Sequence, residues 1–135
     1  MDQSGGTGYP RGDSGWAEEI SLDLDMVSAA CPNCKILLVE AGSASMTNLG
    51  AAVNTAVRLG AKFVSNSYGG SESSSDASYD SAYFNRPGVA ITVSSGDNGY
   101  GTEYPAASPY AKGAPLPFSV MSMSYSWSKG GPIMG

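Results

Sequence analysis

Three apolar runs decide the fold: KILLVEAG at residues 35–42, AKFVSNSY at 61–68 and GVAITVSS at 88–95. Each run is short, continuous and bounded by turn residues, which is typical of a strand buried on both faces. Helical patterns fill the segments before and between them, at residues 16–30, 46–60 and 76–85. The alternation of helix and strand predicts an α/β fold, in which helices cover both faces of a parallel sheet.

The carboxyl ends of the three predicted strands are the expected place for a site, because open parallel sheets bind ligands there. Asp97 follows the third strand in the turn GDNG, residues 96–99. A protonated acid at this position could donate a hydrogen bond to a developing oxyanion. It could equally accept backbone N–H groups and shape the turn, as Asp-Gly pairs often do. Both interpretations stay open on the sequence alone.

Glu19 and Asp23 are four residues apart in the first predicted helix and therefore share one face of it. If this face is buried, desolvation and mutual repulsion raise one pKa, and the two carboxyls can share a proton. Such a pair can act as a general base at acid pH without histidine. The alternative is an acidic first turn that faces solvent.

The chain contains no histidine, which excludes a Ser-His-Asp triad, a Cys-His dyad and a histidine-ligated zinc site. Its twelve Asp and Glu residues are therefore the first candidates for acid–base chemistry. No cofactor and no metal site are predicted. The net charge of −5 argues against a nucleic-acid partner. No apolar run approaches the roughly 18 residues of a membrane span, and no signal peptide is visible.

Ser67 lies in the motif SNSYGG, residues 65–70, directly after the second strand. The motif is not a nucleophile elbow, because Ser65 stands where the first glycine of G-x-S-x-G is required. We expect Ser67, Tyr68, Gly69 and Gly70 to offer backbone groups with which an extended ligand can pair.

Cys31 and Cys34 form the motif CPNC between the first helix and the first strand. In an oxidising compartment they form a disulfide, and in a reducing one they are free thiols. A redox-active motif normally opens a helix, where the dipole lowers the thiol pKa, whereas this motif closes one. Redox catalysis is therefore not expected.

Residues 1–15 are rich in glycine and polar side chains and are predicted to be a flexible lead-in. The tripeptide Arg11-Gly12-Asp13 within them resembles an integrin-binding signal, but three residues carry little information and a loop is the expected reading. Residues 16–110 form the predicted α/β domain, and residues 111–135 an atypical tail.

Four motifs, taken in their order and spacing, resemble the sedolisin family of serine-carboxyl peptidases, which have a subtilisin-like fold. They are EISLD at 19–23, SNSYGG at 65–70, SGDNG at 95–99 and YPAASP at 104–109. The resemblance implies a secreted, acid-active endopeptidase with a Ser-Glu-Asp triad. It makes Glu19 the base, Asp23 the acid that supports it and Asp97 the oxyanion acid. Residues 67–70 would line the groove for the peptide substrate.

The chain also departs from the family pattern. The family's nucleophilic serine lies in a Gly-Thr-Ser motif, which does not occur here, and the family's calcium site lies in the same missing part. The family's strands before Glu19 are largely absent. After residue 110 the sequence becomes rich in Met, Ser and Pro, which suggests a shifted reading frame or unrelated sequence in residues 111–135. The resemblance thus predicts a truncated domain that does not hydrolyse peptides by the family mechanism.

Two other functions stay open. The chain could be a small hydrolase that uses Glu19, Asp23 or Asp97 on a non-peptide substrate such as a glycan, since glycoside hydrolysis needs only two carboxyls. It could instead be a non-catalytic module that forms homo-oligomers through exposed sheet edges. If the chain is an enzyme, we expect a hydrolase in either case.

Overall fold

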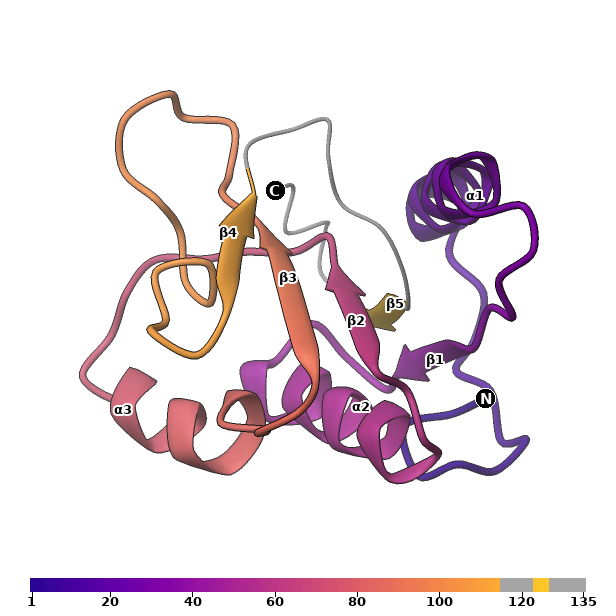
Figure 1. Cartoon of the computed structure of the whole chain (residues 1–135), viewed down its shortest axis with the longest axis horizontal. Coiled ribbons are helices and arrows are strands. Elements are labelled where there is room, and N and C mark those ends of the chain that lie inside the picture. Colours follow the sequence, from indigo (N-terminus) through magenta and orange to yellow (C-terminus); the bar gives the residue numbers. More distant parts are fainter. Residues whose placement is uncertain (115–122, 127–135) are drawn as a thin grey trace.

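The computed structural model describes residues 1–114 and 123–126 (Figure 1). Its first elements follow the predicted order of helix and strand, which confirms a mixed α/β architecture. The elements are α1 (Ser14–Ala30), β1 (Leu38–Ala41), α2 (Met46–Arg58), β2 (Phe63–Asn66), α3 (Asp76–Tyr79) continuing as the π-helical turn η1 (Asp80–Phe84), β3 (Ala90–Ser94), β4 (Lys112–Ala114) and β5 (Met123–Ser126).

The strands form one sheet in the order β1-β5-β2-β3-β4, and the pairings between the described strands are parallel. β4 and β5 come from the predicted tail, and β5 lies between β1 and β2. Both strands were missed in the sequence, where the tail was expected to depart from the fold. The hypothesis of a shifted reading frame concerns the origin of the tail and stays a prediction. Residues 115–122 and 127–135 lie outside the described residues.

Helices cover both faces of the sheet, as the alternating side chains of β1 show. Val39 and Ala41 belong to the main core, to which α2 contributes its apolar face. Leu38 points the other way and packs against Trp16 and Val27 of α1. Figure 1 shows the same arrangement, with α1 on one side of the strands and α2 and α3 on the other. A specifically subtilisin-like arrangement stays a prediction.

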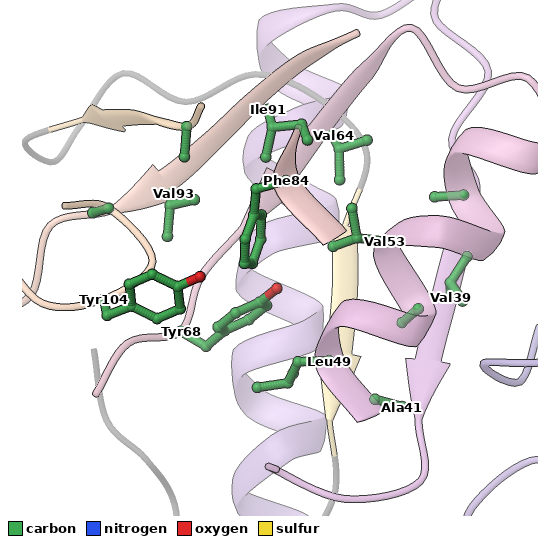
Figure 2. Close-up of a cluster of buried hydrophobic side chains, with 14 residues drawn as sticks. Val39, Ala41, Leu49, Val53, Val64, Tyr68, Phe84, Ile91, Val93 and Tyr104 are labelled. Atoms are coloured by element: carbon green, nitrogen blue, oxygen red, sulfur yellow. The ribbon is translucent and has the colours of Figure 1, made fainter. Parts of the chain in front are cut away.

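The main core lies between the sheet and α2 with α3 and η1 (Figure 2). Leu49, Val53 and Ala56 of α2 are buried at helical spacing, as the sequence pattern predicts. Phe84 of η1 is 1% exposed and meets the ring of Tyr104 edge-on, with 5.9 Å between ring centroids. The predicted third helix thus exists and anchors one end of the core.

Two helix boundaries differ from the predicted ones for local reasons. α1 begins two residues early, because the Asp13 carboxylate accepts the N–H groups of Gly15 and Trp16 as an N-cap. Asp13, the last residue of the integrin-like tripeptide, is therefore engaged within the chain. α2 ends at Arg58, because Gly60 adopts a positive φ of 97° and turns the chain away.

The segment predicted to be a flexible lead-in makes defined contacts with β1. The amino group of Met1 donates to the carbonyl of Leu38, and the N–H of Glu40 donates to the carbonyl of Met1, both at 2.7 Å. The carboxylate of Asp2 accepts three backbone N–H groups of the following turn, which lowers its pKa. Since β1 is an outer strand of the sheet, the first residues of the chain cover part of an open edge.

Candidate active site at the carboxyl ends of the strands

Asp23 of α1 and Ser67, which directly follows β2, meet at the carboxyl end of the sheet. The Ser67 hydroxyl donates a hydrogen bond to Oδ1 of Asp23 at 3.1 Å. The second carboxyl oxygen, Oδ2, is buried and has no hydrogen-bond partner among the described residues. Ser67 was expected to contribute backbone groups to a groove, whereas its side chain belongs to the acid pair.

The environment of Asp23 favours its neutral form. Burial raises the pKa of Asp23 from the ordinary 3.8 to about 7, and the negative charge of Glu19 acts in the same direction. The hydrogen bond from Ser67 stabilises the carboxylate and partly opposes this change. Asp23 therefore holds a proton in acid and exchanges it near neutral pH.

Glu19 lies one turn before Asp23 on the same face of α1, as the spacing predicts. Burial raises the pKa of Glu19, and the charges of Asp97 and Glu18 raise it further. Asp97 itself is exposed in the turn after β3. Glu19 thus interacts electrostatically with both Asp97 and Asp23, so the three predicted acids influence one another. Glu19 and Asp23 are both partly buried, which favours the interpretation as an acid pair over an acidic turn that faces solvent.

Two of the four residues predicted to pair with an extended ligand, Tyr68 and Gly70, are engaged within the chain. Gly70 both donates to and accepts from the backbone of Tyr104, at 2.9 Å in each direction. Its backbone groups are thus used within the chain. The Tyr68 side chain is 1% exposed and belongs to the core, where Figure 2 shows it beside Tyr104.

Glu103, which none of the sequence motifs singles out, also belongs to this region. Its side chain lies against Gly69 and Gly96, and its Cδ is 2.8 Å from the position that a Cβ of Gly96 would occupy. Oε1 accepts a hydrogen bond from Asn98 at 3.0 Å, and Oε2 is buried without a partner among the described residues. Glu103 follows an irregular loop without hydrophobic periodicity. The only signals in the sequence are Gly69 and Gly96, whose lack of a side chain leaves room for a neighbouring one.

Buried oxygens without partners gather at this edge of the sheet. Within the described chain they include Oδ2 of Asp23, Oε2 of Glu103 and Oγ of Ser94, the last residue of β3. Buried polar atoms are nearly always hydrogen-bonded in native proteins, to protein groups or to ordered water. Each of these oxygens therefore needs a partner, such as ordered water, in the native protein.

Cys31 and Cys34 form a disulfide, one of the two states that the sequence left open. The bridge closes the turn after α1, at the other end of this helix from Glu19. Among residues 1–114 and 123–126, no group of three or more His, Cys, Asp or Glu side chains could hold a metal ion. No helix in the same part of the chain is long and apolar enough to cross a membrane.

Comparison with known proteins found no matching family model, no matching curated protein and no matching solved structure. The resemblance to the sedolisin family therefore depends on the four motifs alone. Three of them contribute acids or glycines to the edge described above, at residues 19–23, 65–70 and 95–99.

Proposed function

We propose that this chain forms the acid–base part of an acid-active serine-carboxyl peptidase site. Glu19 is the general base, Asp23 the acid that supports it and Asp97 the acid at the oxyanion. The observation that supports this most directly is the Asp23 carboxyl, bound to Ser67 at 3.1 Å with a pKa near 7 and next to Glu19 on one helix face.

The proposed roles follow from the surroundings of each acid. In acid solution the neutral Asp23 can donate a proton in a hydrogen bond to Glu19, which stabilises a charged base without histidine. Asp97 lies in the turn after β3, at the same end of the sheet as residues 67–69, with which a peptide would pair. This position suits the role at the oxyanion that the family resemblance gives to Asp97.

The nucleophile is the missing part of this chemistry within these 135 residues. The Gly-Thr-Ser motif of the family does not occur, and the hydroxyl of Ser67 donates to Asp23. We therefore expect this chain to bind peptides in acid without cleaving them by itself. Secretion belongs to the same proposal, and a disulfide fits an oxidising compartment.

The acid cluster can be tested without any turnover. Carbon-13 NMR of side-chain carboxyls should give a titration midpoint near 7 for Asp23. Glu19→Gln should lower this midpoint, because it removes a repelling charge. Asp25→Asn, an exposed acid on the same helix, should leave it unchanged. An ordinary midpoint near 4 for Asp23 would remove the basis of the proposal.

A second experiment separates the proposed function from the glycan-hydrolase alternative. Binding of an unlabelled oligopeptide at pH 4 should shift the amide signals of residues 67–69, and hydrolysis of a casein-type substrate and a polysaccharide should be absent between about pH 3 and pH 8. Polysaccharide cleavage that disappears in both Glu19→Gln and Asp97→Asn would replace the peptidase proposal with carboxylate chemistry on glycans. Absence of peptide binding would leave the acids without a substrate role and overturn the proposal.

A further inference from the structure

A second candidate site lies at the opposite edge of the sheet from the acids. A cavity of about 360 Å³ opens at the amino ends of β1 and β2. Three parts of the chain line it: Val27 near the end of α1, residues 35–37 before β1, and residues 59–63 between α2 and β2. Its volume falls within the range of small-molecule sites.

The walls of this cavity are apolar and open to solvent. Ile36, Leu59 and Phe63 line it with exposed fractions of 38%, 43% and 57%. Large apolar side chains that gather at one exposed place often mark a binding surface. Val27, by contrast, is only 3% exposed and forms part of the floor.

The charged residues of the cavity are two lysines, Lys35 and Lys62. Both are exposed, and neither side chain has an ion pair or hydrogen bond within the part of the chain that the structure describes. No acidic side chain of the described residues lines the cavity. Although the protein has a net charge of −5, the charged residues that line this cavity are both cations, which favours an anion there.

Both lysines follow turns of fixed geometry. Lys35 comes directly after the Cys31–Cys34 disulfide. Lys62 comes two residues after Gly60, whose positive φ of 97° sets the turn that leaves α2. The backbone that carries the two cations is therefore held in place before any ligand binds, which lowers the entropic cost of binding.

We propose that this cavity binds a small anionic amphiphile, a carboxylate with an apolar body such as a medium-chain alkyl carboxylate. The apolar part lies against Ile36, Leu59 and Phe63, and the carboxylate lies between Lys35 and Lys62. The proposal is independent of the peptidase-type site, because no residue is shared between the two.

A free amphiphile fits better than a membrane surface. The apolar side chains line a concavity, whereas a protein that lies on a bilayer presents a convex or flat apolar face. The overall charge of −5 also opposes approach to an anionic leaflet.

The test is isothermal titration calorimetry at pH 7 and low ionic strength, with three probes of equal chain length below their micelle concentrations. We expect saturable one-to-one binding of decanoate, weaker binding of decanol and none of decyltrimethylammonium. Lys35→Gln and Lys62→Gln should each weaken decanoate binding roughly five- to tenfold, since each removes one charge-assisted contact. Lys112→Gln, an exposed lysine on β4 outside the cavity, is the matched control and should change nothing.

Three results would overturn the proposal. The first is no saturable decanoate binding by protein whose circular dichroism shows it folded. The second is equal binding of all three probes, which indicates unspecific apolar adsorption. The third is lysine-dependent co-sedimentation with phosphatidylcholine–phosphatidylserine vesicles in place of decanoate binding, which would assign the surface to a membrane.

Discussion

Helix α1 has 17 residues and α2 has 13, yet α1 buries two of its residues where α2 buries six. α2 packs against the main core, which includes side chains from the sheet and η1. α1 packs through a small cluster around Trp16 and Val27. The face with less packing carries Glu19 and Asp23, which are both partly buried. The α2 side of the sheet therefore contributes most of the buried core, whereas the α1 side carries the candidate acids. Functional sites are commonly found in such less tightly packed parts of a fold.

Phe84→Ala should cause the largest loss of stability among the variants that test this difference between the two sides of the sheet. It deletes a fully buried ring of the α2 face and should lower the free energy of unfolding by about 3–5 kcal/mol, measured by urea denaturation. The matched variant is Phe63→Ala, whose ring is 57% exposed and whose loss should change stability by about 0.5 kcal/mol or less. Equal losses of unfolding free energy in the two variants would contradict the assignment of the main core to the side of the sheet that α2 covers.

Gly50→Ala tests the contact between α2 and η1. The ring of Tyr83 lies where a Cβ of Gly50 would stand, so an added methyl group forces the two elements apart. We expect a loss of about 2 kcal/mol in thermal or urea unfolding, although alanine is the better helix former. Gly12→Ala is the control, because nothing lies within 4 Å of its Cβ position. A stabilised Gly50→Ala protein would mean that Tyr83 moves aside freely.

Asp23→Asn tests the α1 face through the pH dependence of stability. The folded-state pKa of Asp23 is raised, so its contribution is fully present below about pH 4 and is lost as pH rises through about 7. The difference from 3.8 sets an upper limit of about 4 kcal/mol, which solvent screening of the partly exposed carboxyl reduces to about 2 kcal/mol. The asparagine variant should match the wild type at pH 4 and exceed it by this amount at pH 8. Parallel pH profiles would show that Asp23 titrates normally.

Ser67→Ala should have the smallest effect, confined to the acid pair. Loss of the hydrogen bond removes a group that lowers the pKa of Asp23, so this pKa should rise above that of the wild type. Ser67→Thr keeps the hydroxyl and should restore the original midpoint in the carbon-13 titration. A change in global unfolding without a change in the Asp23 midpoint would make Ser67 a packing residue only.

The order of the first six elements was predictable because each has a clear local period. The apolar runs before Gly42 and after Gly88 identify β1 and β3, and the spacing of Leu49 and Val53 identifies α2. β4 was not predictable, since Lys112–Ala114 is a three-residue strand without an apolar period of its own. β5 did have a signal that was overlooked: Met123–Ser126 lies within MSMSYSWS at 121–128, where apolar residues and serine alternate with the period of a strand.

The sequence predicts which acids belong to the candidate site, but not which side chains contact them. The spacing of Glu19 and Asp23 shows that they share a helix face, and the fold rule places Asp97 near them. No pattern shows where a serine hydroxyl points, so the contact of Ser67 with Asp23 was missed. Glu103 was missed for the same reason, because its role depends on the approach of two loops.

The side chain of Glu103 fills the space beside Gly69 and Gly96, so the substitutions that these three positions tolerate depend on one another. A side chain at position 69 or 96 would occupy space that the Glu103 side chain fills, and Gly96 also has a positive φ of 92°. A residue larger than glycine at position 69 should therefore be tolerated only after Glu103 has been replaced by a residue with a shorter side chain. Position 96 should remain glycine in either case, because its backbone has a positive φ. Among natural variants of this chain, positions 69 and 103 should change together, and the order of the two substitutions should matter.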